Sequence, residues 1–571
     1  MGRGCATKTL ASLRRAAIVP RPRERLNGPP ILQAKASMNL QEEIARRRTF
    51  AIISHPDAGK TTLTEKMLLY GGAIHLAGAV KARRAQKSAT SDWMQVEKER
   101  GISVTTSVMQ FPYHGLQYNL LDTPGHQDFS EDTYRTITAA DSAIMLIDAA
   151  KGVEAQTEKL FQVCRLREMP IFTFVNKMDR EGRDPLELME EIEKLLHIHC
   201  VPVNWPIGRG GEFRGVYDRY KKVAHMFQRG EGRGDRAVDD RIEWDDDRMR
   251  GILGEDLFKR TKEELELLDI AGEEFDPAKF AAGDITPVFF GSALTNYGIE
   301  PFLESFGEMA PPPVGRVSTV GMIEPSHEKF TGFVFKIQAN MDRNHRDRIA
   351  FMRIVSGEFT RGMEAHHVRN GKRVALNNAV MFFANEREQV ETAFAGDIVG
   401  LYDTGNFAIG DTLTLGEKFQ FEGIPRFCPE IFAAVRTPNP MKRKQLDKGL
   451  LQLSEEGAIQ VLYQPDLGAR EPVLAAIGKL QFEIVKSRLD YEYNCEVKFD
   501  PMPFGSARWI TTKDGKIPED TSRFNRAGIS QVFLDQRGLP IVLFRDDWTM
   551  KYAVRNYEDT LFLQAAPAIS V

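Results

Sequence analysis

Continuously apolar segments alternate with amphipathic segments over residues 46–314. "TFAIIS", "YNLLDT", "SAIMLID", "IFTFVN" and "PVFFGSA" are apolar and end in polar or small residues, which is typical of strands buried on both faces. "TTLTEKMLLY" and "PLELMEEIEKLLHI" have the spacing of helices between such strands. We therefore predict a doubly wound α/β domain over residues 38–314, with its ligand at the carboxyl ends of the strands.

A charged stretch interrupts this pattern. The chain between Asp179 and Ser292 is longer than one helix and one strand need, and it contains "QRGEGRGDRAVDDRIEWDDDRMRGILGED". We predict a surface subdomain inserted at about 210–284. A flexible solvated loop is an equally good interpretation of its middle part.

The pattern changes after "MAPPPVGR", residues 309–316, whose prolines favour an extended linker. Alternating segments separated by glycine, such as "FTGFVFKIQA" and "AGDIVGLYD", predict a small β-barrel at 325–415. Residues 426–571 begin with the strand–helix–strand–strand–helix–strand order of a ferredoxin-like α+β domain. Mixed short elements are expected after it.

Composition is that of an ordinary globular protein, with 42% hydrophobic and 27% charged residues and a net charge of −4. We expect no membrane span, because no run of 18 apolar residues occurs. Five scattered cysteines favour a reducing, cytoplasmic location. The arginine-rich residues 1–37 are interpreted as a misassigned start before Met38 or as a disordered leader, in preference to an organellar transit peptide.

"SHPDAGKT", residues 54–61, is almost a phosphate-binding loop. It ends in Gly-Lys-Thr, but Ser54 stands where glycine is usual. The stretch follows a predicted strand and opens a predicted helix, so its backbone N–H groups would face an anion. Lys60 would reach the β- and γ-phosphates, and the hydroxyl of Thr61 would bind Mg²⁺. Serine is tolerable at position 54 if its φ is not positive.

"DTPGHQ" follows a second predicted strand. Asp122 is placed to hold Mg²⁺ through water, and the N–H of Gly125 to sense a γ-phosphate. His126 is placed to orient an attacking water. A routine turn is the alternative interpretation of this stretch, because Asp, Thr, Pro and Gly all favour turns.

"FVNKMD" and "GSA" follow two further predicted strands. Asp179 offers two acceptors to the N1–H and amine of guanine, which would select GTP over ATP. Asn176 would brace the loop, and the stem of Lys177 would lie over the base. The backbone N–H groups of residues 291–293 would face guanine O6.

"SATSDWMQVEKERGISVTTS" lies between the first two motifs, where GTPases carry a mobile loop. Ser103 is the candidate to complete Mg²⁺ coordination, with Thr105 and Thr106 as rivals. Ile102 would shield the catalytic water. The flanking charges could equally belong to a solvated surface.

The motifs occur in the order that one nucleotide site requires, so the sequence predicts a guanine nucleotide-binding domain. The predicted nucleotide-binding residues are Ser54, His55, Pro56, Asp57, Ala58, Gly59, Lys60, Thr61, Asp122, Thr123, Pro124, Gly125, His126, Asn176, Lys177, Met178, Asp179, Ser292, Ala293 and Leu294. The predicted Mg²⁺ ligands are Thr61, Ser103 and Asp122.

"DAGKTT", "ERGIS", "DTPGH" and "NKMD" together resemble the translational GTPases. Within them, "SDWMQVEKERGISVTTSVMQFPY" is similar to the bacterial class II peptide chain release factors, and the resemblance extends from Met38 to the C-terminus. It implies a ribosome-stimulated GTPase of translation termination that uses GTP/GDP and Mg²⁺. Such a factor stimulates release-factor activity and promotes dissociation and recycling of class I release factors, without codon specificity.

The same resemblance implies residue roles and partners. His126 would be the catalytic histidine, and Pro56 and Ile102 would form a hydrophobic gate around the water. Ser103 departs from the threonine common in the wider family but keeps the hydroxyl. Ribosomal RNA and proteins would be partners of a monomeric factor, with the basic "MKRKQ" (441–445) as one contact; a solvated helix face is nearly as good an interpretation of that cluster.

Three alternatives compete with this function. An elongation factor G-like translocase is disfavoured because few residues follow "YEYNCEVKF". A non-hydrolytic GTP/GDP sensor is disfavoured by the complete set of Lys60, Thr61, Asp122 and His126. An ATPase is disfavoured by Asp179.

Overall fold

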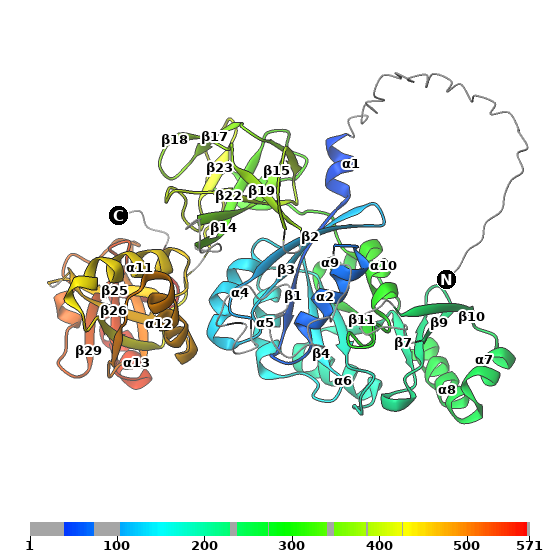
Figure 1. Ribbon diagram of the computed structural model, residues 1–571. Helices are drawn as coiled ribbons and strands as arrows, with labels where there is room; N and C mark the ends of the chain where they lie inside the picture. The colour runs from blue at the N-terminus through cyan, green and yellow to red at the C-terminus, as the bar shows by residue number, and fades with distance from the viewer. Residues whose placement is uncertain are drawn as a thin grey trace, which may run out of the picture. The chain divides into compact units, whose positions relative to one another are not determined.

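The computed structural model describes residues 39–73, 97, 103–228, 237–271, 273–339, 348–383, 386–424, 426–466 and 468–567. Residues 1–37, the predicted leader, lie outside this set. The chain from Leu40 onward forms one unit, and Figure 1 shows its elements in three groups. None of the described helices is long and apolar enough to cross a membrane.

The first group contains a seven-stranded sheet. Its strands in spatial order are β2 (Ser107–Tyr113), β3 (Leu116–Asp122), β1 (Arg47–Ser54), β4 (Ser142–Asp148), β5 (Ile171–Asn176), β11 (Ile285–Phe290) and β6 (His199–Pro202). All neighbours are parallel except β2 and β3. The order reverses beside β1, so the carboxyl ends of β1 and β3 border a crevice in which α/β sheets bind ligands.

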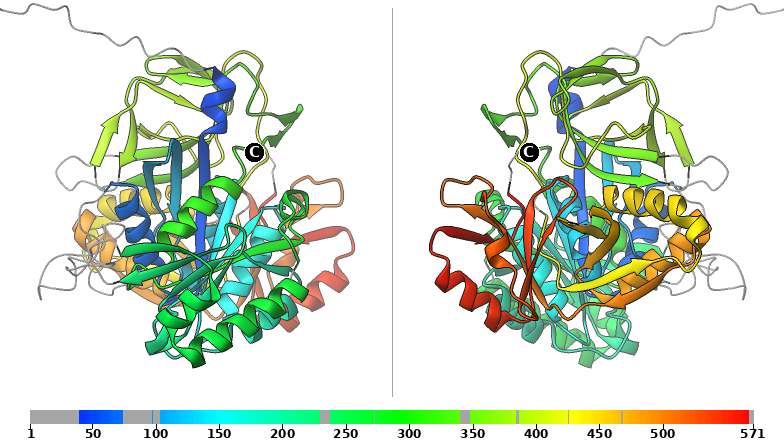
Figure 2. Two further views of the ribbon diagram at one scale, coloured as in Figure 1. Left: turned by 90° about the vertical axis from the view of Figure 1, so that its right-hand side faces the viewer. Right: turned by 90° about the vertical axis from the view of Figure 1, so that its left-hand side faces the viewer.

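Helices cover both faces of this sheet (Figures 1 and 2). One face carries α2 (Lys60–Tyr70), α9 (Pro277–Ala282) and α10 (Ile299–Met309). The other carries α4 (Ser130–Ile137), α5 (Ala155–Arg165) and α6 (Pro185–Leu196). A short helix, α1 (Leu40–Ala45), precedes β1.

Successive residues of one strand pack into opposite cores. Phe50 and Ile52 join the core under α2 and α10, whereas Ala51 and Ile53 join the core under α5. All four are fully buried. This double burial is why the strands are continuously apolar, and it confirms the predicted doubly wound α/β fold.

The edge strand β2 was not predicted. Its residues pair antiparallel with β3 from Ser107 to Tyr113, and of these only Ser107 belongs to the stretch predicted as a mobile loop. The strand contains the buried polar Gln110, which an amphipathic pattern does not anticipate.

The charged insertion has its own secondary structure. An antiparallel sheet contains β7 (Asn204–Ile207), β8 (Gly215–Asp218), β9 (Val223–Gln228) and β10 (Val238–Glu243). The helices α7 (Asp246–Leu253) and α8 (Glu255–Ala271) follow. Asp245 begins α7 by accepting a hydrogen bond from the N–H of Arg248, at 2.9 Å, a local signal that the charged composition obscures.

The second group is an antiparallel β domain of barrel type. After β12 (Arg316–Ser318) and β13 (Gly321–Ile323), its large sheet and a smaller strand pair enclose one apolar core. The strands are β14 (Thr331–Ala339), β15 (Arg348–Ser356), β16 (Glu358–Thr360), β17 (Glu364–His367), β18 (Lys372–Ala375), β19 (Ala379–Phe383), β20 (Glu386–Gln389), β21 (Thr392–Phe394), β22 (Ile398–Tyr402) and β23 (Thr412–Thr414).

The third group begins as the predicted ferredoxin-like unit. Its elements are β24 (Ile431–Arg436), α11 (Arg443–Glu455), β25 (Gln460–Gln464), β26 (Gly468–Ala476), α12 (Lys479–Tyr493) and β27 (Lys498–Pro501). The spatial order β27-β24-β26-β25 is that of a split β-α-β unit. The sheet then continues through β29 (Ser530–Leu534), β30 (Pro540–Phe544), β28 (Ser506–Thr512) and β31 (Thr560–Leu563), with α13 (Asp547–Asn556) beside it.

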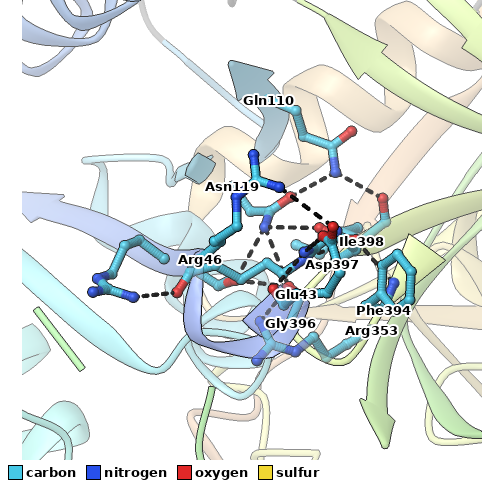
Figure 3. A network of polar contacts seen from close by, with 12 residues as sticks. Glu43, Arg46, Gln110, Asn119, Arg353, Phe394, Gly396, Asp397 and Ile398 are labelled. Atoms are coloured by element: carbon cyan, nitrogen blue, oxygen red, sulfur yellow. Dashed lines mark hydrogen bonds and ion pairs between the residues drawn. The ribbon is translucent and has the colours of Figure 1, made fainter. Parts of the chain in front are cut away.

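Polar side chains join the first two domains, as Figure 3 shows. Asp397, directly before β22, is fully buried and accepts hydrogen bonds from Arg47 Nε at 3.1 Å and Phe394 N at 3.0 Å. The neighbouring carbonyl of Gly396 accepts from Thr49 Oγ1 at 2.7 Å. These contacts tie β1 of the α/β domain to the barrel domain.

Edge strand β2 extends the same interface. Gln110 Nε2 donates to the carbonyl of Ile398 at 3.0 Å and to Asn119 Oδ1 at 2.6 Å. Arg353 NH1 donates to the carbonyl of Gly396 at 2.8 Å, and its NH2 to Asp141 Oδ2 at 2.6 Å. Because these groups are buried, their hydrogen bonds cannot be replaced by water without opening the interface.

Asp397→Ala is expected to destabilise the folded chain by about 3 kcal/mol, because it leaves the buried Arg47 Nε and the part-buried N–H of Phe394 without this acceptor. Urea unfolding measures the loss. Hydrogen exchange should place it in residues 47–54 and 394–402. The matched control is Glu417→Ala at an exposed barrel-domain position; equal stability of the two variants would refute the importance of this contact.

Candidate functional site

The phosphate-loop motif connects β1 to α2. Ser54 is the last residue of β1 and is not among the residues with positive φ, so the torsion condition for a serine is met. Asp57 and Gly59 have φ values of 69° and 99°. A Cβ at Gly59 would overlap with the amide of Asn176, so both conformation and space require glycine there.

Asn176 connects three loops at this edge of the sheet. It ends β5, and its Nδ2 donates to the carbonyl of Ala58 at 2.8 Å. Its Oδ1 accepts from the N–H of Ala293, at 2.9 Å, in the loop after β11. The side chain of Asn176 therefore braces the phosphate loop and the loop after β11.

Lys177 contacts an acid that the sequence pattern did not single out. Its Nζ donates to the carbonyl of Asp57 at 2.5 Å and to Asp148 Oδ2 at 2.7 Å. Burial raises the pKa of Asp148, but the hydrogen bonds from Lys177 and the N–H of Ala150 outweigh it and leave this pKa below its usual value. Asp148 is the last residue of the apolar strand β4. Its position at a strand end could have identified it as a candidate site residue from the sequence.

Asp179 is held by the loop after β11. Ser292 Oγ donates to Asp179 Oδ1 at 2.5 Å. The hydroxyl, which carries no charge, therefore orients the carboxylate. Met178 beside it is buried, and its N–H donates to the carbonyl of Gly291 at 3.1 Å.

The loop after β11 is held by its own backbone N–H groups. Those of Gly291, Ser292 and Ala293 donate to Val175 O, Tyr297 O and Asn176 Oδ1. Leu294, the last member of the predicted segment, has a side chain that is 54% exposed. The contact of this loop to guanine O6 stays a prediction.

The "DTPGH" segment lies directly against the phosphate loop. Thr123 Oγ1 donates to the carbonyl of Ile52 at 2.6 Å, and the carbonyl of Pro124 accepts from Thr133 Oγ1 at 3.2 Å. A Cβ at Gly125 would lie 3.3 Å from the nitrogen of Pro56. The two predicted segments therefore share one surface at Gly125.

Lys60 and Asp122 form a buried ion pair between these segments. Asp122 Oδ2 is buried and has no hydrogen-bond partner among the described residues. Thr61 follows Lys60 in the first turn of α2. A carboxylate oxygen and a hydroxyl beside a phosphate loop are ligands that suit Mg²⁺, although the described residues contain no group of three or more His, Cys, Asp or Glu that could hold a metal alone.

His55 and His126 lie on the two sides of this surface. The N–H of His55 donates to Thr157 Oγ1 at 3.1 Å, and its Nε2 is 3.2 Å from Glu154 Oε1. His126 has a side chain 36% exposed, and its Nδ1 accepts from the N–H of Asp128 at 3.2 Å. Of these two histidines, only His126 directly follows Gly125 in the chain.

The predicted mobile loop is described only near its end. Ser103 is half-buried, and Ile102 lies outside the described residues. The carboxylate of Glu97 accepts from the N–H groups of Val104 and Thr105, at 2.9 and 3.2 Å. Thr106 Oγ1 bonds Asp132 Oδ2 at 2.8 Å, which disfavours Thr106 as the Mg²⁺ ligand.

Comparisons with known families and proteins agree with this geometry. Residues 45–312 match the elongation factor Tu GTP binding domain, residues 329–416 match elongation factor G domain 2, and residues 421–554 match the C-terminal domain of class II release factor RF3. A crystal structure of a protein from Thermus thermophilus has a similar fold, with a TM-score of 0.65 and 24% identity over 86% of this chain and 73% of that one.

Full-length relatives identify the family. The chain is 55% identical to peptide chain release factor 3 from Symbiobacterium thermophilum, over 93% of this chain and 99% of that protein. It is 54% identical to the factor of the same name from Gloeobacter violaceus, over 92% and 99%. The chain therefore belongs to the peptide chain release factor 3 family, the class II release factors, which are GTPases of translation termination.

Proposed function

We propose that this GTPase is activated by the ribosome and hydrolyses GTP by in-line attack of water on the γ-phosphate. In translation termination it acts with class I release factors and promotes their dissociation and recycling. The observation that carries the nucleotide site is Asn176, because one amide holds the phosphate loop and the loop after β11 together.

Each loop has a definite task in this proposal. Lys60 leaves its ion pair with Asp122 and binds the β- and γ-phosphates. The N–H groups at the start of α2 face the same anion. Gly125 senses the γ-phosphate beside Pro56, and His126 orients the attacking water. Catalysis then consists mainly of positioning and electrostatic stabilisation.

Thr61, Ser103 and Asp122 would hold Mg²⁺, whose chemistry is to neutralise charge on the phosphates. The unpartnered Oδ2 of Asp122 supports this set. The hydrophobic gate of Pro56 and Ile102 is proposed for the same site, although Ile102 lies outside the described residues.

The partners follow from the family. We propose that the factor works in the cytoplasm as a monomer, bound to ribosomal RNA and proteins. Lys444 is exposed in the basic segment 441–445, which supports that segment as one contact surface.

His126→Ala is expected to leave GTP affinity unchanged and to lower ribosome-stimulated GTP hydrolysis about 100-fold or more, because the water loses its orienting group. Single-turnover hydrolysis with and without ribosomes measures this. His199→Ala, at an exposed site on β6, is the matched control. Hydrolysis within twofold of the wild type would remove His126 from the mechanism.

Asp179→Asn is expected to weaken GTP binding about tenfold or more and to favour xanthosine triphosphate, because an amide donates where the carboxylate accepts. Competition binding with the two nucleotides measures the change. Asp247→Asn is the control, since that side chain is 95% exposed. An unaltered base preference would show that Asp179 does not contact the purine.

Ser292→Ala is expected to weaken GTP binding about tenfold without altering base preference, because Asp179 loses the hydroxyl that orients it. The same competition assay applies. Ser522→Ala removes an exposed hydroxyl–carboxylate bond at 2.6 Å and serves as the control. A gain of xanthosine triphosphate binding in Ser292→Ala would contradict a purely orienting role.

A further inference from the structure

The N-terminus of helix α12, in the C-terminal domain, lies against the turn that follows His126. The turn is η2 (Gln127–Phe129). Asp128, which is 6% exposed, accepts a hydrogen bond at its Oδ2 from the N–H of Leu480, at 2.7 Å. The first N–H groups of a helix have no partner within the helix, and its dipole favours a carboxylate at this end.

Asp128 replaces a capping side chain that α12 lacks. Gly478 stands at the N-cap of α12 with a φ of −136°, a conformation that alanine also adopts. A Cβ there would nevertheless overlap with the carboxylate of Asp128. The glycine therefore leaves room for a cap supplied by another domain.

The same aspartate contacts the ring of His126. The N–H of Asp128 donates to Nδ1 at 3.2 Å, and Asp128 Oδ1 lies 3.2 Å from the same nitrogen. Both contacts use Nδ1: it accepts from the N–H of Asp128 when it carries no proton, and it donates to Asp128 Oδ1 when it carries one. In either form Asp128 holds the ring.

An apolar contact surrounds this junction. Val104, from the end of the predicted mobile loop, packs with Phe129, Ile484 and Leu480. Both segments that flank the proposed water site therefore meet one face of α12.

A separate contact holds the C-terminal domain in place. Arg135 of α4 is 4% exposed and donates from NH1 to the carbonyls of Glu456 and Gly457, both at 3.4 Å. A change at Gly478 therefore disturbs Asp128 while this second attachment remains.

We propose that Asp128 is a positioning residue for His126 and that the N-terminus of α12 fixes Asp128, so that the C-terminal domain completes the hydrolytic site. The inference rests on the proposed role of His126. It predicts that the position of the domain controls the rate of hydrolysis rather than nucleotide affinity.

Gly478→Ala and Asp128→Ala are expected to lower kcat of ribosome-stimulated hydrolysis about tenfold or more, with GTP and GDP affinities within about twofold of the wild type. Asp128→Asn should retain part of the activity, because its amide oxygen still accepts from Leu480. The control is Gly251→Ala in α7, where an added Cβ meets nothing within 4 Å. Wild-type kcat in Gly478→Ala and Asp128→Ala would overturn the proposal.

Imidazole ¹⁵N NMR of histidine-labelled protein with GDP tests the position of the ring without ribosomes. The wild-type His126 signal, assigned by its loss in His126→Ala, should change in Gly478→Ala and in Asp128→Ala. Unchanged signals in both variants would overturn the inference. If ribosomes fail to stimulate GTP hydrolysis by the wild type, while the ring signal changes in Gly478→Ala and Asp128→Ala, the proposed function is refuted. The inferred contact of α12 and Asp128 with His126 is retained in that case.

Discussion

The amide of Asn176 is the interaction on which the nucleotide site depends. It joins the carbonyl of Ala58 to the N–H of Ala293, two points far apart in the chain that parallel strands bring to one edge. The close approach of Gly59 to the same amide leaves no space for a side chain. One buried group therefore holds the phosphate loop and the loop after β11 together, and the Ser292–Asp179 hydrogen bond joins the same two strand ends.

Buried polar contacts also decide how the nucleotide domain is connected to its neighbours. Asp397 and Arg353 attach the barrel domain to β1 and to Asp141, and Asp128 and Arg135 attach the C-terminal domain to η2 and α4. Buried hydrogen bonds to charged groups are directional and costly to leave unmade. Each domain is thus held to the nucleotide domain at specific points: the barrel domain at the amino ends of β1 and β4, and the C-terminal domain beside the segment that contains His126.

The sequence predicted those features that have a local cause. Strands buried on both faces are apolar throughout, which made the α/β fold recognisable. The phosphate and guanine loops need particular residues in a fixed order at the ends of such strands, which made the site motifs recognisable. Features that arise from pairing between distant segments were not. Strand β2 with its buried Gln110, the pairing of Lys177 with Asp148, and the cap of α12 by Asp128 depend on neighbours that no local pattern specifies. The hydrogen bonds that the N–H groups of residues 291–293 make to Val175, Tyr297 and Asn176 belong to the same class.

Ser54 has a consequence for recognising such domains. Its place at the end of an extended strand removes the conformational reason for glycine, and its buried Oγ has no partner among the described residues. The first position of the loop is therefore free to vary among small side chains, whereas Gly59 is not. A search pattern that demands glycine at both positions would overlook this chain, and one anchored on the second glycine and the distant asparagine would retrieve it.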